Sequence, residues 1–206
     1  MSAEKTPVVP STWSLNSSLA APPAHPPLAL DGVGRLGDLV SLTCEHWPLW
    51  QAADLATALT AGTHPWLGVC PVRIAGRVLL VASTDDTPTL VDQFKTIRAA
   101  RQVGGTIGND VRVLPLRDTD LDEAAALDAI ETQAVGHHVI IDDLGRIAHR
   151  DSPATWRRLQ RIARRSDRLV FVFGGDPHLA STYSDAITSI VGTGKGELFC
   201  KSRALG

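Results

Sequence analysis

The chain has 206 residues, of which 44% are hydrophobic and 20% charged, so it can bury one core of ordinary size. A formal net charge of -2 gives no overall attraction to nucleic acid or to an anionic membrane, so a nucleic-acid role needs a local basic patch. The three cysteines are widely spaced, which argues against a zinc site or a disulfide framework. No run approaches the roughly 20 apolar residues of a membrane span, and the N-terminus lacks a secretory pattern. We therefore expect a cytoplasmic protein without membrane contacts.

The N-terminal segment, residues 1–29, is rich in proline, serine and alanine. Such a segment buries little apolar surface, so we expect an extended or disordered tail. Trp13 is its exception, and its ring either anchors a partner or packs back onto the chain's own domain. The remainder, residues 30–206, is predicted to form a single domain.

Short apolar runs alternate with amphipathic stretches through this domain. The expected strands are 37–43, 77–84, 110–116, 137–145 and 168–175. The expected helices are 50–62, ending at Gly62, 87–104, capped by Thr87 and stopped at Gly104, then 120–135 and 153–167. Two further strands, 184–192 and 196–206, are expected to form a C-terminal β-hairpin. Strands buried on both faces that alternate with helices predict an α/β fold of three layers around a mainly parallel sheet.

Functional groups in such folds lie at the carboxyl ends of the strands. This rule selects residues 44–50, 83–86, 142–143 and 174–176. Asp142 ends an apolar strand, where a carboxylate can hold Mg²⁺ opposite a phosphate-binding loop, although many strands end in aspartate. Asp85 and Asp86 follow another strand, and either a general base or a helix cap fits them.

The segment VGTGKGEL, residues 191–198, contains the G-x-G-K pattern of a phosphate-binding loop. Such a loop also needs an earlier glycine, a serine or threonine after the lysine, and a helix next. Gly196 follows Lys195 here, and an apolar strand follows. The sequence therefore predicts a hairpin turn at this position.

The predicted helix 153–167 carries a basic stripe, which continues to Arg168 beyond its end. The residues that share the stripe at helical spacing are Arg157, Arg161, Arg164, Arg165 and Arg168. A stripe of this kind could contact DNA or an acidic partner. The alternative is a solvent-exposed face whose positive charge balances the negative charge of the acidic helix at 120–135.

Taken in order, these segments resemble the RecA-like ATPase superfamily, in the branch of the DnaB-type and RepA-type hexameric helicases and the KaiC-like proteins. HHVIIDDLGRI is similar to the strand of the metal-coordinating aspartate, which the resemblance places at Asp142. RVLLVASTDDTPTLVDQF is similar to the second strand, with Asp85 near the family's catalytic glutamate. ELFCKSRALG resembles a late strand whose Lys-x-Arg pair reaches a neighbour's nucleotide, and Lys201 and Arg203 match that pair. Gly174 stands where the family often has a polar sensor.

The departure from the family is the turn where its phosphate-binding loop belongs, which here reads CEHWPLW. The residues at the degenerate positions are Cys44, Glu45, His46, Trp47, Pro48 and Trp50. No glycine or lysine is present, Pro48 lacks an N–H donor, and Glu45 would repel phosphate. The tryptophans either plug the vacated pocket or stand exposed as an aromatic contact. We therefore expect no bound cofactor and no metal site.

These features predict a pseudo-ATPase that works as an accessory protein in DNA replication, recombination, repair or translesion synthesis, similar to ImuA-type proteins. Its partners would be proteins of the DNA-processing machinery, with DNA as a further candidate, in a homo- or hetero-oligomer. The alternative is an ATP- and Mg-dependent subunit of a ring, or a regulatory subunit that supplies Lys201 and Arg203 to a partner's nucleotide site. A hydrolase using Cys44 and His46 is the third hypothesis, but the small residues of a nucleophile elbow are missing.

Overall fold

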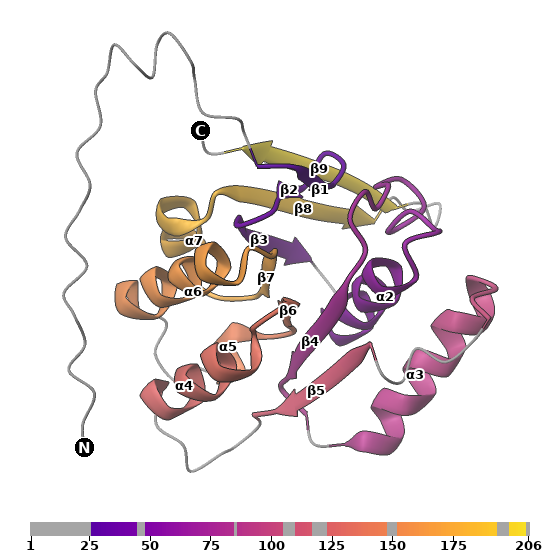
Figure 1. The fold of residues 1–206 in the computed structure, drawn as a ribbon, viewed down its shortest axis with the longest axis horizontal. Helices are drawn as coiled ribbons and strands as arrows, with labels where there is room; N and C mark the ends of the chain where they lie inside the picture. Colours follow the sequence, from indigo (N-terminus) through magenta and orange to yellow (C-terminus); the bar gives the residue numbers. More distant parts are fainter. Residues whose placement is uncertain are drawn as a thin grey trace, which may run out of the picture.

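A computed structural model describes residues 26–44, 48–84, 86–104, 110–116, 123–147, 152–192 and 198–204 of the protein (Figure 1). The strands are β1 (Leu28–Leu30), β2 (Gly34–Arg35), β3 (Leu39–Cys44), β4 (Arg77–Ala82), β5 (Val111–Pro115), β6 (His137–Ile141), β7 (Val170–Phe173), β8 (Ala186–Gly192) and β9 (Leu198–Ala204). The helices are α2 (Pro48–Ala61), α3 (Thr87–Ala100), α4 (Glu123–Gln133), α5 (Leu144–Ile147), α6 (Pro153–Ser166) and α7 (Pro177–Tyr183).

Seven of these strands form one sheet in the order β5-β4-β6-β7-β3-β8-β9. The first six in this order run parallel to one another, and β9 pairs antiparallel with β8. Parallel strands of one sheet are joined by crossover connections, usually helices, and each of these connections lies on one face of the sheet. The predicted α/β fold with a mainly parallel sheet and a C-terminal pair of antiparallel strands is confirmed.

The helices make two layers, one on each face of the sheet (Figure 1). α2 and α3 cover one face, where Leu55 and Leu59 of α2 enter a core that also holds Phe171 of β7. α4, α6 and α7 cover the other face, where Trp156 and Leu159 of α6 enter a second core. The central strands face both cores and are apolar throughout, as in β7, where all four residues are buried.

α6 shows how the sequence encodes one of these elements. The Ser152 hydroxyl accepts a hydrogen bond from the Thr155 N–H at 3.2 Å, and proline occupies the first turn. The residues buried on its inner face, at helical spacing, are Thr155, Trp156, Leu159, Ile162 and Ala163. The arginines fall between them and point outward or toward α4.

Several element ends differ from the sequence predictions. Asp86, not Thr87, caps α3, because its carboxylate accepts a hydrogen bond from the Thr89 N–H at 3.1 Å. The same helix ends at Ala100 rather than Gly104, with Arg101 as its C-cap. Gly62 follows α2 with φ +65 as predicted, and a side chain there would also meet Ala75.

The sequence predicts no defined structure for the segment before β4. β1 and β2 pair with each other, and the chain between Trp66 and Ile74 packs against β1 through backbone hydrogen bonds. β1 begins at Leu28, so two residues of the predicted tail belong to this strand pair. Trp66 from this segment is fully buried in the core under α2.

Candidate functional site

β3 and β7 are parallel neighbours within the sheet, so their carboxyl ends lie side by side. From β3 the chain enters α2 on one face, whereas from β7 it enters α7 on the other face. Neighbouring strands whose connections part in this way leave a crevice at their ends, where ligands of parallel α/β proteins bind. β4 and β6 part in the same way, toward α3 and α5.

The connection from β3 to α2 is short. β3 ends at Cys44 and α2 begins at Pro48, so three residues separate them. Glu45, His46 and Trp47 themselves lie outside the described residues, as do the side chains of Cys44 and Pro48.

Trp50 lies in the first turn of α2 with 37% of its surface exposed. Its side chain lines a hollow of about 530 Å³ together with Asp54, His64 and Arg101. The partial exposure of Trp50 fits the interpretation as an exposed aromatic contact, whereas Trp47 lies outside the described residues.

Asp142 lies directly after β6 and is fully buried. Its carboxylate accepts hydrogen bonds from the N–H of Ser83 at 2.7 Å and from the Ser83 hydroxyl at 3.2 Å. Burial raises the pKa of Asp142 to about 6, while the hydrogen bonds from Ser83 act in the opposite direction. Ser83 follows β4, so this contact joins the ends of two neighbouring strands. The sequence predicts functional groups at both strand ends, but no motif in it assigns a role to Ser83.

Asp143 and Gly174 meet at the ends of β6 and β7. Gly174 has φ +74, and a Cβ atom there would lie 3.0 Å from Oδ1 of Asp143. Asp143 forms an ion pair with Arg146 at 3.2 Å. The absence of a side chain at Gly174 therefore leaves room for the Asp143 carboxylate at this edge.

The remaining predicted nucleotide-site residues are only partly described. Asp85 lies outside the described residues, and its neighbour Asp86 caps α3, which confirms for Asp86 the interpretation as a helix cap. Lys201 and Arg203 are in β9, where they pair with Ser189 and Ile187 of β8. Their side chains lie outside the described part of the structure. β9 is the outermost strand, separated from β3 by β8.

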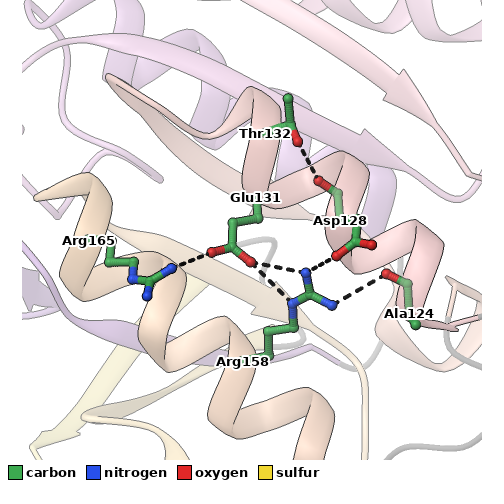
Figure 2. A network of polar contacts seen from close by, with 6 residues as sticks. All are labelled: Ala124, Asp128, Glu131, Thr132, Arg158 and Arg165. Atoms are coloured by element: carbon green, nitrogen blue, oxygen red, sulfur yellow. Dashed lines mark hydrogen bonds and ion pairs between the residues drawn. The ribbon is translucent and has the colours of Figure 1, made fainter. Parts of the chain in front are cut away.

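The arginines of α6 pair with the acidic helix α4 (Figure 2). The Arg158 guanidinium contacts both Asp128 and Glu131, and Arg165 reaches Glu131 at 2.7 Å. Hydrogen bonds from Arg158 are the main reason that the pKa of Glu131 is lowered. For Arg165, this ion pair agrees with the alternative interpretation, in which the basic stripe balances the charge of an acidic helix. Arg158 lies outside the stripe predicted from helical spacing.

The other arginines of the stripe have different surroundings. Arg157 lies over the Tyr183 ring at 5.4 Å from its centroid and donates a hydrogen bond to the Tyr183 hydroxyl at 3.2 Å. Arg164 lies 3.8 Å from Asp185, and Arg161 is exposed. Arg168 follows the helix and is half-buried.

The described residues contain no group of three or more His, Cys, Asp or Glu side chains that could hold a metal ion. None of the helices described is long and apolar enough to cross a membrane. No protein-family model matches this chain, and no curated protein matches it either. Its function is therefore inferred from the residues and geometry of the strand ends.

Proposed function

We propose that this protein is a non-catalytic relative of the RecA-like ATPases that works as an accessory protein through contacts with other proteins. The observation that carries the proposal is the three-residue connection between β3 and α2. A phosphate-binding loop of this kind spans eight positions, of which four are defined: two glycines, a lysine, and a serine or threonine. The residues between Cys44 and Pro48 supply none of these.

The surroundings of Asp142 support the same proposal. A carboxylate that holds Mg²⁺ for phosphoryl transfer needs to face the metal and the phosphate oxygens. The Asp142 carboxylate is instead buried and accepts two hydrogen bonds from Ser83. It joins the ends of β4 and β6, which is a structural role.

The resemblance of the sequence to RecA-like proteins supplies the cellular context. DNA replication, recombination, repair or translesion synthesis are the processes in which a RecA-like protein without a nucleotide site would assist an active enzyme. The proposed partners are proteins of that machinery, and the exposed arginines of α6 are a candidate contact for DNA.

Equilibrium dialysis with radiolabelled ATP tests the proposal. We expect no binding at nucleotide concentrations up to about 1 mM, with or without Mg²⁺. Micromolar binding that depends on Mg²⁺ and is lost in Asp142→Asn would contradict it. That result would favour the alternative, an ATP-binding subunit of a ring.

A second test concerns the partners. Affinity capture from the native cell, with the tagged full chain, is expected to recover a DNA polymerase, recombinase or helicase component. Capture of proteins without any nucleic-acid function would contradict the DNA-processing context but not the absence of nucleotide binding.

A further inference from the structure

An apolar groove lies between α3 and β5, at the edge of the sheet. It has a volume of about 500 Å³ and an open side. Its apolar lining comes from Leu90, Val91, Phe94, Val111, Val113 and Pro115. Val91 and Val113 are each 43% exposed, so this edge carries apolar surface that the rest of the described chain does not cover.

The backbone of β5 offers hydrogen-bonding groups along the same groove. Among the described strands, β5 is the last at this end of the sheet, and it pairs with β4 on one side. The Asp110 carbonyl accepts a hydrogen bond from the Val78 N–H, and the Leu116 N–H donates one to the Ala82 carbonyl. The backbone N–H and C=O groups of the even-numbered residues of this strand therefore face β4. Strand residues alternate in direction, so the N–H and C=O groups of Val111 and Val113 point away from β4. An added strand could pair with them, up to Pro115, which lacks an N–H.

Basic side chains lie on both faces of such an added strand, and Asp110 directly precedes β5. Lys95 and Arg98 line the groove itself. Arg112 is exposed on the opposite face of β5, because successive side chains of a strand alternate between faces. Asp92 forms an exposed ion pair with Lys95 at 3.1 Å, and such a pair is worth little. An added strand of alternating pattern would therefore place its apolar side chains over the groove and its other side chains on the face of β5 that carries Arg112.

We propose that this edge binds an extended segment of a partner protein in which apolar and acidic residues alternate. The inference rests on the proposed function, since it names the surface for the protein contacts. The chain's own segment before Pro26 fits less well, because its only acidic residue is Glu4 and prolines interrupt it. A second copy that pairs antiparallel through Val111 and Val113 of both chains would place Arg112 opposite Arg112, which is unfavourable.

A synthetic peptide tests this surface directly. The probe has seven residues and blocked ends, with valine or isoleucine alternating with glutamate or aspartate. Its control replaces every acidic residue by lysine. Fluorescence anisotropy at low salt is expected to show binding of the acidic probe and at least tenfold weaker binding of the lysine peptide. Equal binding of the two peptides, or no binding of the acidic probe, overturns the proposal.

Variants separate the groove from the rest of the surface. Val113→Asp is expected to weaken binding of the acidic probe by at least tenfold, whereas Val69→Asp, at an exposed valine outside the groove, leaves it unchanged. Arg112→Glu is expected to reverse the preference between the two peptides. Because Arg112 and Val113 are exposed, these changes should leave the fold intact, which thermal melting verifies. Unchanged binding in both variants overturns the proposal.

Amide hydrogen exchange by NMR adds a readout that is specific for strand pairing. Bound probe is expected to slow exchange at Val111 and Val113, but to change Arg112 and Leu114 little, because those amides already face β4. Protection elsewhere, or a dimer that Val113→Asp dissociates, overturns the assignment of a partner segment to this edge. ATP binding would refute the proposed function and leave these peptide results in place, so the two failures are distinguishable.

Discussion

Asp142 combines full burial, an ionisable carboxyl group and two hydrogen bonds from Ser83. Its pKa is about 6 in the folded protein against 3.8 for a free aspartate. The folded state therefore binds the proton more tightly than the unfolded chain does. This contribution to stability is fully present below pH 3.8 and is lost as the pH rises through 6. This difference in pKa between the folded and unfolded states corresponds to about 3 kcal/mol in the free energy of unfolding.

Asp142→Asn is expected to raise the free energy of unfolding at pH 7.5 by about 1–3 kcal/mol. The amide removes the buried charge, and its oxygen can still accept a hydrogen bond from the Ser83 N–H. Urea denaturation at pH 7.5 and pH 4 measures the effect, which should nearly vanish at pH 4. A variant that is less stable than the wild type at pH 7.5 would show that the charge itself is favourable there.

His138 has the opposite pH dependence, at the other end of β6. Its side chain is fully buried, and burial is the main cause that lowers its pKa to about 4 from 6.5. The neutral form is therefore favoured in the folded state, and stability is lost as the pH falls from 6.5 to 4. Its Nδ1 accepts a hydrogen bond from Leu169 at 3.3 Å, which requires the neutral ring.

His138→Asn is expected to reduce this loss of stability at acidic pH. The variant should be less stable at pH 7, because the smaller side chain leaves a cavity, but it should lose about 2–3 kcal/mol less than the wild type between pH 6.5 and pH 4. Unfolding free energies at four pH values across this range measure the difference in slope. Parallel curves for the two proteins would exclude His138 as the source of the acid sensitivity.

At the scale of elements, one buried ion pair fastens α2 to the end of α3. Arg101, the C-cap of α3, bonds Asp54 of α2 through two nitrogens at 2.6 Å and the Pro65 carbonyl at 2.9 Å. The two side chains are 13% and 5% exposed. Breaking a buried pair leaves one charge without a partner, which costs far more than the pair itself contributes.

Arg101→Met is therefore expected to cost about 3–5 kcal/mol of stability, measured by urea denaturation. The double variant Asp54→Leu with Arg101→Met should recover most of this loss, because no charge is then left buried. Arg73→Met is the matched control, since the Arg73 side chain is 61% exposed in its pair with Asp31, and should cost less than about 1 kcal/mol. Equal costs for the two single variants would refute the special role of Arg101.

The sequence predicted the long elements because their patterns are local. β6 and β7 are apolar throughout, and α6 buries a stripe at helical spacing, so periodicity sufficed. β1 and β2 have three and two residues, too few for a period to show. The Asp54–Arg101 pair joins residues 47 positions apart, and no local pattern signals such a contact.

The candidate site was predictable in position but not in contacts. Asp142 follows an apolar strand, and strand ends are the expected location of functional groups. Its hydrogen bonds to Ser83 depend on β4 and β6 being neighbours, which is a property of the sheet order. Likewise, the basic stripe of α6 was visible from spacing, but its pairing with α4 follows from the packing of the two helices.

At the scale of the whole molecule, charge limits any contact with DNA. The net charge is -2, and Arg158 and Arg165 are paired with α4. The exposed arginines of α6 that do not pair with α4 are Arg157, Arg161 and Arg164. Each phosphate contact with single-stranded DNA contributes about -0.7 to the slope of log affinity against log salt.

Binding of single-stranded DNA by this face should therefore be weak, with a salt slope no steeper than about -2. Arg161→Glu is expected to reduce the affinity and make the slope shallower by about 0.7, because one phosphate contact is lost and a repulsive charge is added. Arg77→Glu, at an exposed arginine of β4, is the control and should change neither quantity beyond the general effect of net charge. Fluorescence anisotropy with a labelled oligonucleotide at four salt concentrations measures both. A slope near -5, or an equal effect of the two variants, would place the DNA contact on a different surface from α6.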